Sequence, residues 1–412
     1  MQSDERSLLL NTFRAALAAV NGRVCVARTL TGYKPLAPVH AVAVGKAAGA
    51  MMLGALDVWG RAIRQALVVA KRGHGMPGAP FDERVQVIEA GHPLPDEGSL
   101  EAGRAVLSFV DAAPADAQFL FLISGGASSL MEVLPEGMDL TQWRQANDWL
   151  LASGLDIAHM NEVRKALSCV KGGRLALRLG GHRTLGLLIS DVRGDDPATI
   201  GSGLLAASDA TPALDGLALP DWLRELTDAA PPLPTPAQSV ALDLTLEIVA
   251  RLDDAVQAAA AAAREAGRPA TVHPEFVDGD AAAVGARLAE RLLEEVPGVH
   301  VWGGETTVRL PTAPGRGGRN QHLALSAAQF LRGHHAVALL AVGTDGTDGP
   351  GGDAGALVDG GTVARGEAEG FDARDCLARA DSGSFLQASG DLIHTGPTGT
   401  NVMDLIIGLK RG

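Results

Sequence analysis

Residues 119–130 read FLFLISGGASSL, an apolar run that ends in a loop of glycine and serine. Five consecutive apolar side chains are typical of a strand buried on both faces, as in a parallel sheet that is covered by helices. The chain contains further apolar runs of this kind, and helical patterns separate many of them, so the sequence predicts an α/β fold. Six further apolar runs are expected to be strands, at 40–44, 66–70, 85–89, 185–190, 299–302 and 336–342.

Charged side chains follow several of these strands at the point where each strand ends. Lys46 follows the strand at 40–44, and Asp191 follows the strand at 185–190. Glu305 lies in a glycine turn after 299–302, and Asp345 lies in GTDGTDG after 336–342. Ligands of open parallel sheets bind outside the carboxyl ends of the strands. The sequence therefore predicts a ligand site that is built from these loops.

The loop after 119–123 has the composition of an anion site. Small residues let backbone N–H groups approach a phosphate closely, and a helix start adds a favourable dipole. A tight strand-to-helix turn is the alternative. Residues 201–206 (GSGLLA) satisfy G-x-G-x-x-A but lie well past the nearest strand, and nothing matches the P-loop pattern. The expected nucleotide-binding residues are Ser124, Gly125, Gly126, Ala127, Ser128 and Ser129.

The remaining candidates are two cations and a set of acids. Lys46 would oppose the dipole of the helix that follows it. A bound anion beside Lys46 would explain this position, whereas an ordinary surface lysine is the alternative. Arg319 has the planar fork that suits carboxylate and phosphate groups. Asp191 is placed to be a base or a metal ligand, whereas Asp196, before Pro197, also fits a helix cap. Mg²⁺ would suit the loop of Asp345, for which Asx turns are the structural alternative.

The composition limits the class of protein. A formal charge of −13 argues against a nucleic-acid-binding surface. Three widely spaced cysteines fit no disulfide framework or metal motif, and no apolar run approaches the length of a membrane span. A cytoplasmic protein that does not bind membranes is expected. The Pro-rich segment 229–237 suggests two domains, 1–235 and 236–412.

Taken together, the motifs resemble those of the class II glycerate 2-kinases, the family whose C-terminal region is the MOFRL domain. The similar blocks keep the family's order over almost the whole chain. They are VGKAAGAMM (44–52), GHPLPDEGSLEAGR (91–104), LISGGASSL (122–130), NEVRKALSCVKGGRLA (161–176), SDVRGDDPATIGSG (190–203), GGETTVRL (303–310), GRGGRNQHLALS (315–326), GTDGTDGPGGDAGALVDG (343–360) and TGPTGTNVMDL (395–405).

The resemblance implies a Rossmann-like α/β/α N-terminal domain, a smaller α/β MOFRL domain, and an active site in the cleft between them. It also implies ATP, D-glycerate and a divalent cation, usually Mg²⁺. Lys46, Asp191 and Arg319 match the family's functionally important lysine, aspartate and arginine. The chain departs from the family at Ala127, at Leu204 and at 380–383, where Ala-Asp-Ser-Gly replaces Asn-Asp-Ser-Tyr.

Phosphoryl transfer depends mainly on positioning and on neutralisation of charge. We expect Lys46, Arg319 and Asn320 to bind substrate, and Asp191 to act on the 2-hydroxyl or to hold Mg²⁺. Glu305 and Asp345 are further candidate metal ligands. An NAD(P)H-dependent hydroxypyruvate reductase, a kinase for another 2-hydroxy acid and a non-catalytic metabolite sensor are the alternatives. The oligomeric state is left open, with a homodimer among the options.

Overall fold

The computed structural model describes residues 3–75, 78–155, 157–207 and 214–412. The chain forms two compact units, a first unit of Gly22–Val249 and a second unit that combines Met1–Asn21 with Ala250–Gly412. The expected boundary at residue 235 thus differs from the division at 249/250. The reason is that β6 (Leu244–Ala250), beyond the Pro-rich segment, still pairs in the first sheet. Helix α1 (Ser3–Ala19), in turn, packs on α11 (Leu252–Glu265) of the second unit.

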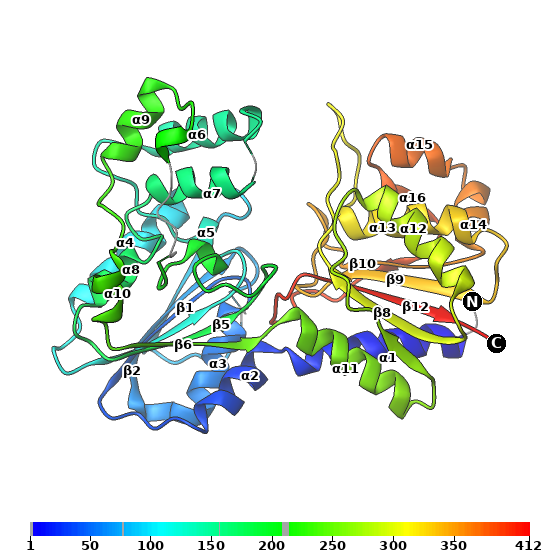
Figure 1. Ribbon diagram of the computed structural model, residues 1–412. Helices are drawn as coiled ribbons and strands as arrows, with labels where there is room; N and C mark the ends of the chain where they lie inside the picture. The colour runs from blue at the N-terminus through cyan, green and yellow to red at the C-terminus, as the bar shows by residue number, and fades with distance from the viewer. Residues whose placement is uncertain (1–2, 76–77, 156, 208–213) are drawn as a thin grey trace. The chain divides into compact units, whose positions relative to one another are not determined.

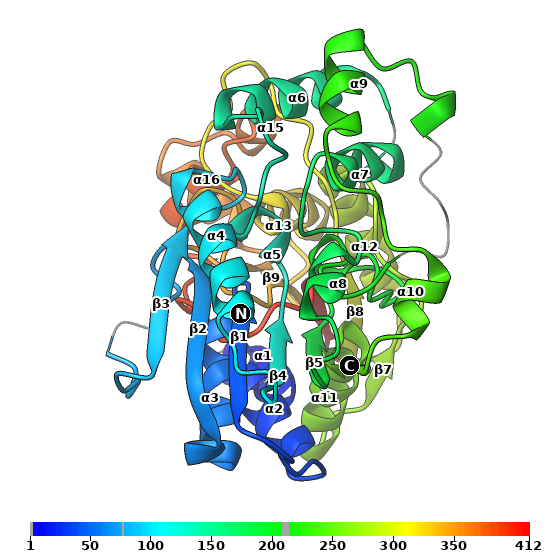
Figure 2. The same cartoon turned by 90° about the vertical axis from the view of Figure 1, so that its left-hand side faces the viewer.

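The first unit is built on a six-stranded sheet with the order β3-β2-β1-β4-β5-β6 (Figure 2). The five strands from β3 to β5 are parallel to their neighbours. This is the Rossmann-like order, in which the chain reverses its direction of travel between β1 and β4. All five were predicted from the sequence. Their bounds are β1 Val39–Val44, β2 Ile63–Lys71, β3 Val85–Ala90, β4 Gln118–Ile123 and β5 Thr184–Ile189.

Helices cover both faces of this sheet. α3 (Ala48–Trp59) lies on one face, and α4 (Glu97–Asp111) and α8 (Arg174–Leu179) lie on the other (Figure 1). The core between the sheet and α4 includes Phe119 and Phe121, both fully buried. The continuous apolar runs were therefore a correct indication of strands with two buried faces. The first unit also contains α2 (Gly22–Leu30), α5 (Ala127–Leu130) and α10 (Pro236–Val240).

Three more helices of the first unit form a small hydrophobic cluster of their own. They are α6 (Leu140–Ala152), α7 (Ile157–Ala166) and α9 (Asp221–Asp228). Trp143, Ala146, Val163 and Leu223 are buried in this cluster.

The second unit contains a mixed sheet with the order β11-β10-β9-β12-β8-β7. β12 is antiparallel to both of its neighbours, β8 and β9, so those two strands run in the same direction. The prediction of mainly parallel strands is therefore wrong for this sheet, because a fully buried antiparallel strand has the same continuous apolar pattern. The bounds are β7 Ala270–Val272, β8 Gly298–Gly304, β9 Val337–Gly343, β10 Gly355–Asp359, β11 Leu392–Ile393 and β12 Asp404–Lys410.

Helices also cover both faces of the second sheet. α1 and α11 lie on one face, and α12 (Ala281–Glu294) and α13 (Arg319–Leu331) lie on the other (Figure 1). Three short helices complete this unit, α14 Thr362–Ala368, α15 Ala373–Ala378 and α16 Ser382–Ala388. Because β8 and β9 are codirectional, the loops that follow them meet the start of β12 at one edge, where Asp404 pairs with Gly304 and Gly343.

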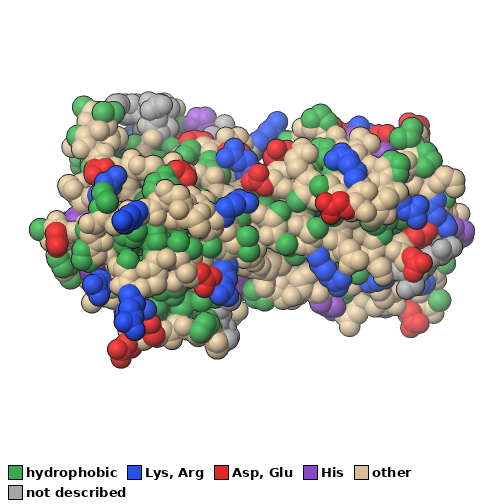
Figure 3. All heavy atoms as spheres, turned by 90° about the horizontal axis from the view of Figure 1, so that it is seen from below, with side chains coloured by type: hydrophobic (Ala, Val, Ile, Leu, Met, Phe, Trp, Pro, Cys, Tyr) green, Lys and Arg blue, Asp and Glu red, His purple; other side chains and the backbone are tan. Residues whose placement is uncertain are grey.

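None of the described helices is long and apolar enough to cross a bilayer. On the face of the molecule drawn in Figure 3, basic and acidic side chains are interspersed.

Candidate active site

The first cluster of candidate residues lies where the loops after β1 and β4 meet, at the reversal point of the first sheet. The Lys46 backbone N–H donates to the Gly125 carbonyl at 2.9 Å, and the Ala47 N–H donates to Ser124 Oγ at 3.1 Å. A Cβ at Gly45 would lie 2.2 Å from Ser124 Oγ, so only glycine permits this approach. The two loops are thus locked to each other at the place where doubly wound folds bind ligands.

Gly126 brings Lys46 and His92 together. Its φ is 84°, and a Cβ placed on it would lie 3.1 Å from His92 Nε2 and 3.3 Å from Lys46 Cγ. Two potentially cationic side chains therefore flank the glycine of the predicted nucleotide loop. Lys46 is itself partly exposed, as a ligand-binding lysine must be.

Two helices begin beside this loop. α5, which follows Gly126 directly, spans only Ala127–Leu130, so its dipole is weak. α3 spans twelve residues, and its N-cap residue Ala47 forms no side-chain capping bond. The expected dipole contribution thus comes mainly from the helix after Lys46, not from the helix after the serine loop.

Ser202 supports the loop from a third direction. Its hydroxyl lies 2.7 Å from that of Ser128, and Gly201, Ser202 and Gly203 all have positive φ, at 57°, 59° and 67°. A left-handed backbone is unfavourable for serine and persists only where the surroundings impose it. The segment 201–206 is a turn centred on the 3₁₀ helix Ile200–Ser202, in agreement with its interpretation as a loop.

Asp191 and Asp196 have different environments. Asp191 follows β5 and Ser190 and is partly exposed. Asp196 accepts hydrogen bonds from the Ala198 N–H at 3.0 Å and from Thr199 Oγ1 at 2.9 Å. Asp196 is therefore the cap of a turn, whereas the geometry of Asp191 leaves its predicted chemical role open.

The second cluster, in the second unit, is centred on Arg319, the first residue of α13. Its guanidinium forms a two-bond fork with the Asp404 carboxylate, at 2.5 and 3.0 Å, and contacts Glu305 at 2.9 Å. Burial alone would lower the pKa of Arg319, but the Asp404 and Glu305 carboxylates raise it above its ordinary value. Asp404 is 2% exposed and Glu305 is 42% exposed, so the guanidinium has one buried and one solvent-accessible edge.

Asp348 caps the same helix from a distant loop. Its two carboxylate oxygens accept from the backbone N–H groups of Asn320 and Gln321, at 3.0 and 2.8 Å. The Asn320 amide lies in the same contact, 3.4 Å from Asp348 Oδ1. Asn320 is 1% exposed, so its predicted role in substrate binding is not supported by an accessible side chain. The start of α13 is therefore occupied by a carboxylate of the protein.

Asp348 is expected to make stability depend on pH. Burial raises its pKa from 3.8 to about 6, although the two N–H donors oppose that shift. A carboxyl with a raised pKa in the folded state stabilises the fold most below its unfolded pKa, and this contribution is lost as pH rises through 6. Between pH 5 and 7.5 we expect a loss of about 1 kcal/mol in the free energy of unfolding. Urea unfolding of the wild type and of Asp348→Asn checks this, since the variant should lack that loss.

The loop Gly343–Gly349 joins several motifs of the second unit. Asp345 Oδ1 accepts from the Thr347 N–H at 2.9 Å, which is the Asx turn that the sequence left as an alternative. The Thr344 hydroxyl donates to the Met403 carbonyl at 2.7 Å, and the Thr398 hydroxyl donates to the Thr344 carbonyl at 2.5 Å. The TGPTGTN segment and the GTDGTDG loop are thus packed together beside Arg319. Asp345 is 6% exposed, and its Oδ1 is already engaged by the Thr347 N–H.

A cavity of about 390 Å³ opens at the start of α13. This volume is within the range of small-molecule sites. His322 in its wall is held by Ser382 at 3.0 Å, and burial lowers its pKa, so the imidazole is neutral at pH 7. The lining includes Thr306, Val308, Gly317, Arg319, His322 and Ala380.

Comparison with known proteins identifies the family. Residues 8–223 match a family described as a domain of unknown function, DUF4147, and residues 298–404 match the MOFRL family. The D-glycerate 2-kinase of Thermotoga maritima is 40% identical over 381 residues, which is 89% of either chain. The chain belongs to the glycerate 2-kinase family with a MOFRL domain.

Two further comparisons extend over nearly the whole chain. A crystal structure of a glycerate kinase from Thermotoga maritima superposes with a TM-score of 0.85 at 37% identity, covering 99% of this chain and 100% of that one. A protein of Agrobacterium vitis that is named a hydroxypyruvate reductase is 38% identical over 417 residues, 97% of this chain and 93% of that one. Relatives in this family thus carry two different enzyme names.

One departure from the glycerate 2-kinase family has a structural consequence. Ala380 has a φ of 52° and follows α15 in a Schellman motif, in which the Asp381 N–H donates to the Cys376 carbonyl and the Ala380 N–H to that of Leu377. This left-handed position favours glycine or asparagine. The Asn that the family often has before Asp-Ser-Tyr would fit the conformation without the strain that alanine carries.

We therefore expect Ala380→Gly to stabilise the protein. Glycine removes the steric strain that alanine has in the left-handed conformation, which should raise the free energy of unfolding by about 0.5–1 kcal/mol. Ala378→Gly is the matched control, because Ala378 is exposed in the last helical turn of α15 and should lose about 1 kcal/mol on the same change. Thermal unfolding measures both. Equal destabilisation in the two variants would refute the strain at Ala380.

The structure brings the sequence-predicted site residues together in two groups. Lys46 and the loop 124–129 form one in the first unit, where Asp191 follows β5. Arg319, Asn320, Glu305 and Asp345 form the other in the second unit. The convergence of both groups in one cleft stays a prediction.

Sequence reasoning missed four supporting residues. Asp404 and Asp348 were not singled out, although an acid beside a predicted functional arginine is the expected partner. Glu132 and Lys171 form an ion pair whose side chains are 1% and 2% exposed, with Ser168 donating to Glu132 at 2.6 Å. Lys171 lies in the block NEVRKALSCVKGGRLA, so a charged residue in an otherwise small and apolar motif was the available signal.

Proposed function

We propose that this chain transfers the γ-phosphoryl group of ATP to the 2-hydroxyl of D-glycerate, giving 2-phosphoglycerate and ADP. The observation that carries the proposal is the forked Arg319–Asp404 pair beside a cavity, in a chain 40% identical to a D-glycerate 2-kinase over 89% of its length. A guanidinium held in this way presents an accessible edge to an anion. Its side chain is already ordered, so it loses little conformational freedom when the anion binds.

The roles follow from charge and position. Lys46 would hold phosphate oxygens of ATP at the loop 124–129 or the migrating phosphoryl group, and the N-terminus of α3 adds to the positive potential there. Arg319 would bind the carboxylate of glycerate or the transferring phosphoryl group. Its Nη1 contacts the exposed Glu305, and an anionic substrate would exchange with that carboxylate.

In the transfer itself, the 2-hydroxyl oxygen of glycerate forms a bond to the γ-phosphorus while the bond to the β–γ bridging oxygen breaks. ADP leaves with that oxygen and its electron pair. Asp191 would orient the hydroxyl and accept its proton. Lys46 and Arg319 neutralise the charge that spreads over the phosphoryl oxygens.

Mg²⁺ is the expected metal, because it binds to one or two carboxylates together with phosphate oxygens and water. Asp191 can supply such a carboxylate if another group accepts the proton of the 2-hydroxyl. Glu305, once exchanged from Arg319, offers an exposed carboxylate, whereas Asp345 is buried and already accepts from Thr347. When bound, the ion would offset the charge of the β- and γ-phosphates.

The alternative activity is reduction of hydroxypyruvate, the name carried by two relatives from Agrobacterium vitis. A dinucleotide fold of this kind places G-x-G-x-x-G in the turn after β1. That turn here reads Gly45-Lys46-Ala47-Ala48, so alanine stands at 47, where the fingerprint needs its second glycine for close approach of the pyrophosphate. The cytoplasmic location and the oligomeric state rest on the sequence alone and stay predictions.

A paired assay tests the proposal. ADP release is measured with D-glycerate, ATP and Mg²⁺, and NADH or NADPH oxidation is measured with hydroxypyruvate on the same preparation. The proposal requires ADP release that depends on D-glycerate and exceeds that with lactate or glycolate. Nicotinamide oxidation without ADP release would overturn it in favour of the reductase, and stronger ADP release with another 2-hydroxy acid would overturn the substrate assignment.

A further inference from the structure

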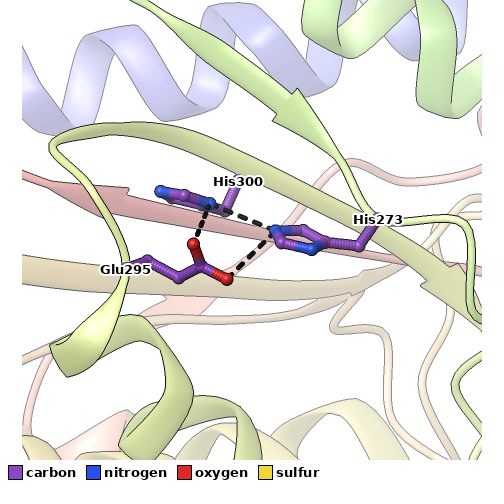
Figure 4. Close-up of side chains that lie close together, drawn as sticks. All are labelled: His273, Glu295 and His300. Atoms are coloured by element: carbon purple, nitrogen blue, oxygen red, sulfur yellow. Dashed lines mark hydrogen bonds and ion pairs between the residues drawn. The ribbon is translucent and has the colours of Figure 1, made fainter.

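A third cluster of polar side chains lies in the second unit, apart from the residues to which we assign catalysis. His273 follows β7, His300 lies in β8, and Glu295 lies between α12 and β8. Figure 4 shows the two imidazoles and the carboxylate turned toward one another. His300 is 1% exposed and His273 is 6% exposed, so both rings are buried.

The distances in this cluster suit a small metal ion. His273 Nε2 and His300 Nδ1 are 3.1 Å apart, and each lies 3.9 Å from one oxygen of Glu295. One ligand atom from each residue falls within 4.8 Å of the other two. In a tetrahedral zinc site with bonds of about 2.0 Å, neighbouring ligand atoms are about 3.3 Å apart. The triangle is therefore close to the size that three ligands of one ion require.

His300 is prepared for this role by its other nitrogen. Nε2 lies 2.9 Å from the Val296 carbonyl, which can only accept, so the ring proton resides on Nε2. Nδ1 then carries a lone pair that faces His273 and Glu295. A backbone carbonyl that fixes the tautomer of a histidine ligand in this way is typical of metal centres.

His273 is held by an arginine that a metal would have to displace. Arg291 Nη2 lies 2.7 Å from His273 Nδ1, so this nitrogen accepts and the ring proton points at His300. Burial, and next the charge of Arg291, lower the pKa of His273, so the ring is neutral at pH 7. Arg291 also pairs with Glu275 and, through its Nε at 3.0 Å, with Glu295 of the cluster itself, and its side chain is 41% exposed. An ion would have to displace the guanidinium from both His273 and Glu295. Movement of the guanidinium toward solvent with Glu275 would leave Nδ1 free to take the proton.

The surroundings favour a rigid site. The Trp302 ring stacks on His273 with centroids 4.3 Å apart and an interplanar angle of 5°. Trp302 is fully buried, whereas the Glu295 side chain is 23% exposed and marks the side from which an ion could enter. Strand β8 fixes His300 and Trp302 on the same face, two residues apart.

We propose that His273, Glu295 and His300 bind one divalent transition-metal ion of the Zn²⁺ class. Two imidazoles and a carboxylate are the ligands that suit Zn²⁺ rather than Mg²⁺, which prefers oxygen alone. The ion would join β7, β8 and the segment after α12. The site is separate from the nucleotide-associated Mg²⁺ of the proposed reaction and does not depend on it.

Binding can be followed in the full chain with Zn²⁺ and Co²⁺ alone. Trp302 is the only tryptophan of the second unit, since the other four lie at 59, 143, 149 and 222. We expect one Co²⁺ per chain, with visible absorption of a low-coordinate N/O site and quenching of tryptophan fluorescence that is absent in Trp302→Phe. Zn²⁺ should abolish both signals by competition. Binding of Co²⁺ without quenching of Trp302 would overturn the assignment.

Three variants make the test specific. His300→Gln should weaken binding by about 100-fold or more, because it removes one of three ligands. Arg291→Met should tighten binding about tenfold, because it removes the competing cation. His394→Gln, which changes an exposed histidine paired with Asp353, should leave binding unchanged. Thermal unfolding of each metal-free variant establishes that it is folded.

Two further outcomes would refute the site. If His394→Gln weakens binding as much as His300→Gln does, the ion is held adventitiously at the surface. If Arg291→Met fails to bind at all, the arginine supports the cluster rather than competing with the ion, and the three residues form a hydrogen-bonded network of structural importance only.

Discussion

Replacing Arg319 by alanine is expected to lower kcat with D-glycerate by about 10³-fold. An arginine that neutralises charge in a phosphoryl-transfer transition state is worth about 10³–10⁵ in rate. The measurement is the rate of ADP release at saturating ATP and D-glycerate. Arg319→Lys should recover only part of the loss, since a lysine supplies the charge but not the fork that binds Asp404 and an anion together.

The same substitution also affects stability, which must be separated from catalysis. Asp404 is 2% exposed, and loss of its partner leaves a buried carboxylate unpaired, at a cost of about 3–5 kcal/mol. Circular dichroism and urea unfolding at the assay temperature establish whether Arg319→Ala is folded. Arg316→Ala is a matched control, because Arg316 lies in the same GRGGR segment but pairs with Asp353. A folded Arg319→Ala enzyme with more than a tenth of normal turnover would contradict the assignment.

Replacing Lys46 by methionine is expected to lower kcat/KM for ATP by about 10²–10³-fold with little loss of stability. Lys46 is partly exposed at the start of α3, and methionine keeps the unbranched aliphatic chain while removing the charge. Loss of one cation from a phosphate site is worth several kcal/mol in the transition state. Steady-state kinetics with ATP varied at saturating D-glycerate measure the effect.

A control for Lys46 lies at the end of the next strand. Lys71, the last residue of β2, carries the same charge, but β2 does not border the reversal point between β1 and β4. Lys71→Met should retain most of the activity. Similar losses in both variants would indicate a general electrostatic effect of the first unit, and normal kinetics in Lys46→Met would remove this lysine from the site.

The strands could be predicted wherever the apolar run was long and continuous. All seven predicted runs are strands, and six of them are buried on both faces, whereas β3 lies at the edge of its sheet and is half exposed. β12 and β10, which complete the centre of the second sheet, were not predicted, since their apolar runs sit between glycine-rich motifs that dominate the pattern. The apolar pattern of a fully buried strand is the same whether it runs parallel or antiparallel to its neighbours, so the antiparallel pairing of β12 could not be predicted.

The candidate site was predictable in its loops but not in its partners. Lys46 and Arg319 were identified because charged residues follow strands or precede helices within glycine-rich motifs. Asp404 and Asp348 hold Arg319 and cap α13 through contacts between residues 85 and 28 positions apart. Such pairs depend on tertiary packing. The His273–His300 pair was missed for the same reason, because its members lie 27 residues apart without a motif spacing.

The most direct test of the central claim is the identity of the product. Phosphorus NMR of a reaction with ATP, Mg²⁺ and D-glycerate should show ADP together with a monoester whose phosphorus couples to the single proton on C2. Wild-type protein should form this ester, and folded Lys46→Met and Arg319→Ala should form little of it. A phosphate ester at C3, or no ester at all from a folded wild-type protein, would contradict the account.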